Sequence, residues 1–199
     1  MTKTIVFDVD GILLDFNKKF KEWVFKHHNL EIEYNPEYYS FYEYKHFSED
    51  KQEFFEKKLM DFIRRFENNL PLIDAKLPIL INKLRDEMGY KIVLITAYGG
   101  SQELRKKNLT HFGIKYDRII FEHDKLHVVQ DLKPEVAICV EDRPLTVLSY
   151  AKHNIHTAIP THWTYCKKFI AEMTDKNLMK YIHGYSNTDE LEQCIIKVL

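Results

Sequence analysis

Five short apolar runs recur along this chain, each bounded by turn-forming or charged residues. Runs of this length are typical of β-strands that are buried on both faces of a sheet. Helical patterns of apolar residues separate them, and strands that alternate with helices predict a parallel sheet wound by right-handed crossovers. The expected strands are residues 4–9, 91–96, 118–121, 136–140 and 155–159, and the clearest expected helices are residues 74–88, 101–112 and 188–198.

One segment, residues 16–71, breaks this alternation. It contains none of the six glycines but 15 of the 27 aromatic residues. Its second half has apolar residues at helical spacing, which predicts helices rather than more strands; these are Phe54, Phe55, Leu59, Phe62, Ile63 and Phe66. We therefore expect residues 1–15 and 72–199 to form a three-layer, Rossmann-like α/β core. Residues 16–71, hereafter the cap segment, should form a small helical cap inserted after the first strand. Most of its aromatic side chains should form the cap's own core, and a minority should line a pocket.

The bulk composition narrows the class of protein. A chain of 199 residues with 45% hydrophobic residues can bury a full core. Its 29 basic and 30 acidic residues nearly balance, so the overall charge does not attract the protein to nucleic acid or to an anionic membrane. Three cysteines without metal-type spacing indicate reduced thiols, and no apolar stretch of signal-peptide or membrane-spanning length follows Met1. We expect a cytoplasmic protein whose oligomeric state the sequence leaves open.

Asp8 and Asp10 lie at the end of the first expected strand. Strand periodicity places both carboxylates on one side, at the edge of a parallel sheet where ligands bind. With 13 aspartates in 199 residues, about one Asp-x-Asp is expected by chance. The inference therefore depends on the strand before the pair and on Gly11, which permits a sharp turn after it.

A second acidic pair, Glu141 and Asp142, follows the fourth expected strand. If that strand lies beside the first, the two acidic pairs meet at one edge of the sheet. Buried carboxylates repel each other unless a cation neutralises them, and oxygen ligands without Cys or His nearby favour Mg²⁺ over zinc. The competing interpretation is a strand-to-helix turn, with Asp142 as the helix cap and Pro144 at the first helical position.

Other residues near these strand ends could bind a phosphate group. Thr96 ends the second expected strand, and its hydroxyl, together with the N–H groups from Ala97 onward, could hold phosphate oxygens. Lys125 begins a helix ahead of the fourth strand, where its ammonium could reach a phosphate or the carboxylate of Asp8.

Neighbouring residues offer an alternative lysine for the phosphate site and an alternative metal site. Lys133 lies closer to the fourth strand than Lys125 does, but it precedes Pro134 in an expected loop, so Lys125 is preferred. His123 and His127 are four apart and could chelate a metal from one helix face, but we interpret them as surface residues.

Taken together, these features resemble the haloacid dehalogenase (HAD) superfamily of phosphatases. Four segments look like its four motifs, in the right order: residues 5–13, 94–96, 125 and 138–142. Within the superfamily, residues 124–125 and 141–144, with a helical insertion after the first motif, look most like the 5'-nucleotidases of the deoxyribonucleotidase type and their bacterial relatives. Two positions depart from the family pattern. Ile12 stands where a threonine or valine is usual, and the acidic pair is Glu-Asp rather than Asp-Asp, which makes Asp142 the safer ligand.

The resemblance implies a Mg²⁺-dependent phosphomonoesterase. In that scheme Asp8 attacks phosphorus in line and forms an aspartyl phosphate, while Asp10 protonates the leaving alkoxide and then activates water. The resemblance also implies that Mg²⁺ is bound by the Asp8 carboxylate, the Asp10 main-chain carbonyl and the Asp142 carboxylate, with Glu141 in or near the outer coordination shell. The phosphate-binding groups named above would neutralise the transferring phosphoryl group.

The expected substrate is a small phosphate ester. Nucleoside monophosphates are favoured by the resemblance and by aromatic residues able to stack on a base. A HAD phosphatase for another small metabolite, a phosphotransferase and a polynucleotide end phosphatase are the alternatives. The near-neutral charge counts against the last of these. A non-catalytic binding module would be expected to lack Asp8 or Asp10.

Overall fold

The computed structural model describes residues 2–31, 39, 49–66, 70–97 and 99–199, without the side chains of residues 49–56 and 66. In chain order the elements are β1 (Thr4–Asp8), α1 (Phe16–His28), α2 (Glu49–Phe66), α3 (Leu77–Asn82), the π-helical turn η2 (Lys83–Glu87), β2 (Lys91–Thr96), α4 (Gln102–His111), β3 (Arg118–Phe121), α5 (Lys125–Asp131), β4 (Val136–Val140), α6 (Pro144–Lys152), β5 (Thr157–Pro160), α7 (Thr164–Glu172), α8 (Lys176–Met179), β6 (Ile182–Tyr185) and α9 (Thr188–Val198).

The strands form one parallel sheet in the order β3-β2-β1-β4-β5-β6. The predicted α/β fold with a parallel sheet and a helical insertion after the first strand is therefore confirmed. The strand order reverses direction at β1, which lies between β2 and β4. In open sheets of this kind the crevice outside the carboxyl ends of the strands, at the point of reversal, is where ligands bind.

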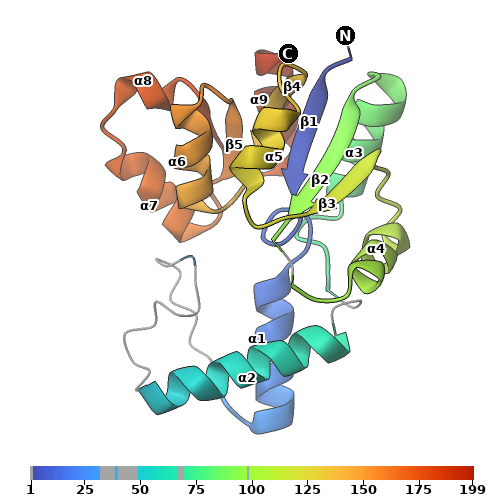
Figure 1. Cartoon of the computed structure of the whole chain (residues 1–199), viewed down its shortest axis with the longest axis vertical. Coiled ribbons are helices and arrows are strands. Elements are labelled where there is room, and N and C mark those ends of the chain that lie inside the picture. Colours follow the sequence, from blue (N-terminus) through green and yellow to red (C-terminus); the bar gives the residue numbers. More distant parts are fainter. Residues whose placement is uncertain (1, 32–38, 40–48, 67–69, 98) are drawn as a thin grey trace.

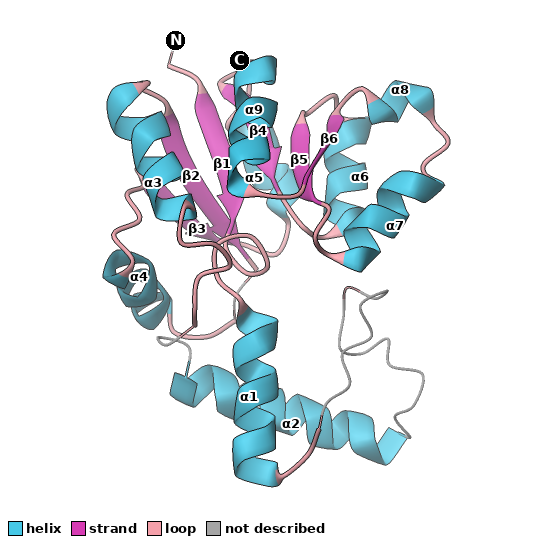
Figure 2. Ribbon diagram, turned by 180° about the vertical axis from the view of Figure 1, so that it is seen from behind, coloured by secondary structure: helices cyan, strands magenta, loops and turns pink. Residues whose placement is uncertain are grey.

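Helices cover both faces of the sheet (Figures 1 and 2). Because side chains alternate along a strand, Ile5 and Phe7 pack into a core with residues of α3 and α9, whereas Val6 packs on the other face with residues of α5 and α6. These β1 residues are at most 2% exposed. Burial on both faces explains why β1 has a continuous apolar run, and it fixes the position of Asp8 at its end.

The expected elements and the observed ones differ in three places. β6 was not expected, because His183 and Gly184 interrupt its apolar run. The fifth strand begins at Thr157 rather than at residue 155, because Asn154 has a φ of 58° and the chain is still turning there. The expected helix 74–88 begins at Leu77, next to Pro78, and its last turn is the π-helical η2.

The two helices of the cap segment, α1 and α2, lie beyond the carboxyl ends of the strands (Figure 1). Their described aromatic rings pack together as predicted: the centroid of Phe62 lies 5.2 Å from that of Phe20 and 5.6 Å from that of Trp23. The side chains of Phe54, Phe55 and Phe66 lie outside the described residues. The boundaries of the cap at residues 16 and 71 stay a prediction.

The chain enters and leaves the cap segment side by side. The Asp15 amide donates to the Pro71 carbonyl at 2.8 Å, and the Ile73 amide donates to the Leu13 carbonyl at 3.0 Å. Leu14 and Leu72 form an antiparallel bridge between these two bonds. This short ladder, hereafter the hinge, joins the cap segment to the core next to the carboxyl end of β1. None of the helices in the described ranges is both long and apolar enough to cross a bilayer.

Candidate active site

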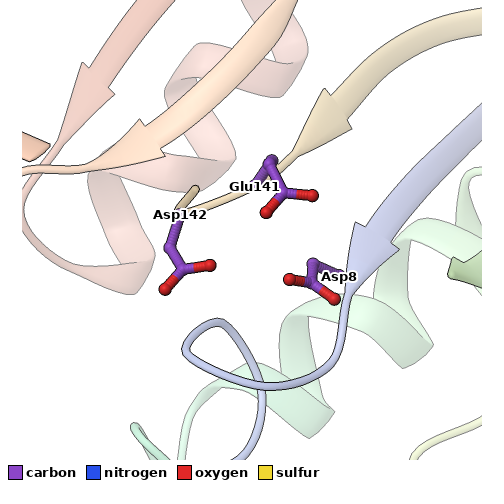
Figure 3. Close-up of side chains that lie close together, drawn as sticks. All are labelled: Asp8, Glu141 and Asp142. Carbon is purple, nitrogen blue, oxygen red and sulfur yellow. The ribbon is translucent and has the colours of Figure 1, made fainter. Parts of the chain in front are cut away.

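Three carboxyl groups converge at the carboxyl ends of β1 and β4. Asp8 ends β1, and Glu141 and Asp142 directly follow β4, which pairs with β1. Their side chains point toward one another (Figure 3), and one oxygen of each lies within 4.8 Å of the others. All three residues are at most 5% exposed. The structure thus brings together two residues of the predicted metal site and the residue predicted beside it.

Lys125 neutralises part of this acidic cluster. It is the first residue of α5, whose N-cap Asp124 accepts a hydrogen bond from the His127 amide. Its Nζ lies 2.8 Å from Asp8 Oδ2 and 2.8 Å from Glu141 Oε2. Burial alone would lower the pKa of Lys125, but the charges of Asp8 and Glu141 outweigh it and raise the pKa above its ordinary value.

The alternative residues named for this region lie elsewhere. Lys133 is exposed and donates to the His153 carbonyl at 2.7 Å, so Lys125 is the lysine that reaches the acidic cluster. His123 and His127 are exposed, as expected, and His127 Nε2 lies 3.6 Å from Asp131 Oδ2.

The acidic cluster holds more negative charge than Lys125 can balance. Burial, and then the charge of Glu141, raise the pKa of Asp142 to about 8. The same two causes, in the same order, raise the pKa of Asp8 well above its ordinary value, against the opposing effect of Lys125. Buried Asp142 Oδ1 accepts no hydrogen bond from any described residue. A buried carboxylate oxygen without a donor, among three acids and one lysine, fits a divalent cation with oxygen ligands.

The turn after β1 requires glycine at position 11. Gly11 has a φ of +83°, a conformation that side chains disfavour, and a Cβ there would overlap the carboxylate of Asp142. Trp163 Nε1 donates to the Gly11 carbonyl at 3.0 Å and so fastens the turn to the loop before α7. Gly11 therefore allows the β1 turn and the acidic end of β4 to approach closely.

The interpretation of Asp142 as a simple helix cap is wrong. Pro144 does occupy the first position of α6, but Arg143 is the N-cap residue, and its own side chain makes no capping hydrogen bond within the described part of the chain. The Asp142 carboxylate instead accepts a hydrogen bond from the Tyr165 hydroxyl at 2.7 Å. Glu141 Oε1 accepts from the Arg143 amide at 3.0 Å, so Glu141, not Asp142, supports the turn.

The Asp10 carboxylate is not part of this acidic cluster. Its Oδ1 lies 2.7 Å from Nη1 of Arg105 in α4, and its Oδ2 accepts from Thr96 Oγ1 at 3.4 Å. Thr96 is 1% exposed and ends β2, as predicted, with Ala97 partly buried next to it. The carboxylates of Asp8 and Asp10 are therefore held by different cations, although they are only two residues apart.

Several residues of the site were not found by sequence reasoning. Arg105 and Tyr165 lie on helices, and Trp163 lies in a loop, so none marks a strand end. Tyr39 of the cap segment lies with its ring centroid 5.6 Å from that of Tyr165 and 5.8 Å from the guanidinium of Arg143. Among these residues, helical periodicity in the sequence could have indicated burial only for Arg105, which lies on the buried stripe of α4 with Asn108 and Leu109.

Comparison with known proteins identifies the fold. No protein-family model matches the sequence, and neither does any curated protein. Solved structures do match over nearly the whole chain. A hydrolase of the haloacid dehalogenase-like family from Streptococcus pneumoniae superposes with a TM-score of 0.66 at 15% identity, covering 98% of both chains. A proposed β-phosphoglucomutase from Thermotoga maritima gives 0.62 at 16% identity, covering 100% of both chains.

A third structure, a proposed HAD-type hydrolase from Bacillus subtilis bound to magnesium, gives 0.59 at 14% identity and covers 98% of this chain and 99% of that one. Identities this low show the fold alone. The chain thus has the fold of the HAD-like hydrolases, and the comparisons add nothing in favour of the narrower resemblance to 5'-nucleotidases.

Proposed function

We propose that this chain is a Mg²⁺-dependent phosphomonoesterase that acts through an aspartyl phosphate on Asp8. One observation carries the proposal: Lys125 Nζ lies 2.8 Å from Asp8 at the carboxyl end of β1, beside the Asp142 carboxylate oxygen that accepts no hydrogen bond from the described residues. A carboxylate nucleophile needs a cationic surrounding to meet an anionic phosphate ester, and this site offers an ammonium and a place for a metal.

The metal would be held by the carboxylates of Asp8 and Asp142 and, by the resemblance, by the Asp10 main-chain carbonyl, with Glu141 close by. When bound, Mg²⁺ neutralises the clustered carboxylates and the phosphate oxygens that approach them. The magnesium in the Bacillus subtilis neighbour supports this choice of ion.

Each protein group then has a defined task. A carboxylate oxygen of Asp8 attacks phosphorus and forms the new P–O bond while the ester P–O bond breaks in line. Asp10 donates its proton to the departing alkoxide. Asp10 then takes a proton from the water that attacks the aspartyl phosphate, which releases inorganic phosphate and restores Asp8. Lys125, Thr96 and the N–H groups from Ala97 onward stabilise the phosphoryl oxygens.

Nucleoside monophosphates are the substrate class that the surroundings of the site favour. The rings of Trp163 and Tyr165 are stacked, with centroids 6.2 Å apart, and Tyr39 packs edge-on against Tyr165. Tyr165 also contacts the proposed metal ligand Asp142. A phosphate bound at Asp8 would therefore bring its attached group near several aromatic rings, on which a base can stack.

A substrate panel tests the proposal. We expect phosphate release that requires Mg²⁺ and is faster from nucleoside monophosphates than from sugar phosphates or from an oligonucleotide with a terminal phosphate. Asp8→Asn and Asp10→Asn should fold but lose turnover, whereas Asp131→Asn, an exposed control on α5, should keep it. Near-normal rates from Asp8→Asn would refute the nucleophile assignment, and equal rates for all esters would refute the nucleotide preference.

A further inference from the structure

Arg105 is a fully buried cation from α4 whose guanidinium reaches the site. Its side chain is 0% exposed, and its Nη1 lies 2.7 Å from Asp10 Oδ1. Thr96 Oγ1 contacts the other oxygen of the same carboxylate at 3.4 Å. Both oxygens of Asp10 are thus contacted by residues of β2 and α4.

Stability does not explain an arginine at this position. Taking a guanidinium out of water costs several kcal/mol, and a buried ion pair is often replaced by apolar residues without loss of stability. Position 105 lies one turn before the buried Leu109 on the same stripe of α4, where leucine or methionine would ordinarily pack. The arginine is therefore better explained by its contact with the Asp10 carboxylate, which is 29% exposed.

The two neighbouring carboxylates of β1 have separate cationic partners. Lys125 holds Asp8, and Arg105 holds Asp10. Without Arg105, the Asp10 carboxylate would keep the long contact with Thr96 but lose its shorter one, and a cation bound at the acidic cluster could draw it away. Such a movement would take the acid and base group away from the leaving oxygen and turn it into a further metal ligand.

The helix that carries Arg105, α4, is itself held in place by hydrogen bonds. Ser101 caps α4 by accepting from the Leu104 amide at 3.3 Å. One turn after Arg105, buried Asn108 makes two hydrogen bonds with the Leu70 backbone, of 3.0 and 3.1 Å, just where the chain returns from the cap segment to the hinge. The same face of α4 therefore contacts both Asp10 and the chain beside the hinge.

We propose that Arg105 is a positioning residue that fixes the carboxyl group of Asp10 for its proton transfers with the leaving group and with water, and keeps it out of the metal site. This inference rests on the proposed function for its chemical meaning. Its structural part, that Arg105 sets the orientation of Asp10, stands independently of any activity.

The test compares Arg105→Met and Arg105→Lys with Lys107→Met, an exposed control on the same helix. Leaving groups that need a proton depend on Asp10, whereas p-nitrophenolate leaves without one. In Arg105→Met, the rate of leaving-group release in a single turnover should fall about 100-fold for an alkyl phosphate but only a few-fold for p-nitrophenyl phosphate. This rate leaves out the later hydrolysis of the aspartyl phosphate, which uses Asp10 with either substrate. Arg105→Lys should recover part of the loss, and Lys107→Met should behave like the wild type.

Other outcomes overturn the inference. Equal losses of this single-turnover rate on both substrates would mean that Arg105 supports the fold, and a rise in KM with an unchanged rate would mean that it binds the substrate. A crystal structure of Arg105→Met gives the readout besides activity: an unmoved Asp10 side chain would refute positioning. A wild-type protein that hydrolyses no ester would refute the proposed function, and this crystal structure would still decide whether Arg105 orients Asp10.

Discussion

Replacing Asp142 by asparagine should stabilise the metal-free protein while removing a proposed metal ligand. The pKa of Asp142 is raised from 3.8 to about 8 by burial and by Glu141. A carboxyl whose pKa is higher in the folded state stabilises that state while it is protonated. Its contribution is complete below the unfolded pKa and is lost as the pH rises through the folded pKa. Between about pH 5.5 and about pH 8.5 the loss amounts to about 3 kcal/mol.

Asparagine keeps the shape of aspartate but cannot ionise. Its amide oxygen can still accept the hydrogen bond from Tyr165. In the absence of metal, the free energy of unfolding of Asp142→Asn should therefore exceed that of the wild type at both pH values, and the excess should be about 3 kcal/mol larger near pH 8.5 than near pH 5.5. Mg²⁺ should raise the stability of the wild type much more than that of the variant, because ligand binding stabilises the folded state.

The assay is urea unfolding followed by circular dichroism at both pH values, with EDTA and with MgCl₂. The variant and the wild type are compared at the same pH, because other groups titrate in this range. For example, burial and then His156 lower the pKa of His183 to about 4, which makes stability rise with pH up to the ordinary histidine value. Asp131→Asn is the exposed control. A variant that is no more stable than the wild type near pH 8.5 would refute the electrostatic account of the acidic cluster.

Three other substitutions have defined outcomes. Gly11→Ala should lower the free energy of unfolding in urea by about 3 kcal/mol or more, because the new Cβ overlaps a buried carboxylate. Gly89→Ala should lower it by about 1 kcal/mol, because Gly89 has a φ of +74° but open space around it. Equal losses would contradict this account. Asn108→Ala should cost about 2 kcal/mol, because it leaves two buried backbone groups at Leu70 without partners, and an unchanged melting temperature would argue against it. Lys125→Met should lower the free energy of unfolding in EDTA by about 3 kcal/mol, because it leaves the buried carboxylates without their cation. MgCl₂ should restore part of this loss. An equal loss with and without Mg²⁺ would show that charge is not the cause.

The placement of Asp8, Thr96 and Asp142 could be predicted because each lies at or just after the end of an apolar run. In a parallel sheet those ends share one edge, so positions along the chain translate directly into positions in space. Lys125 could be predicted less directly, from its place at the start of a helix that leads into β4. The roles assigned to these residues stay predictions until activity is measured.

The remaining parts of the site depend on contacts across the fold. Tyr165 reaches Asp142 from α7, and Arg105 reaches Asp10 from α4, across sequence separations of 23 and 95 residues. Helical periodicity indicates that position 105 faces inward, but it does not say which group lies opposite. Likewise, β6 was missed because a strand with His183 and Gly184 is recognisable only by its pairing with β5.

The hinge also has a consequence for how this architecture can be altered. Because the amide of Asp15 and the carbonyl of Pro71 are hydrogen-bonded, the chain between them begins and ends at nearly one point in space. A tight turn could join these ends without changing the course of the sheet. The cap segment is therefore a modular part, which recombination or design could exchange while the strand ends that hold Asp8 and Asp142 remain in place.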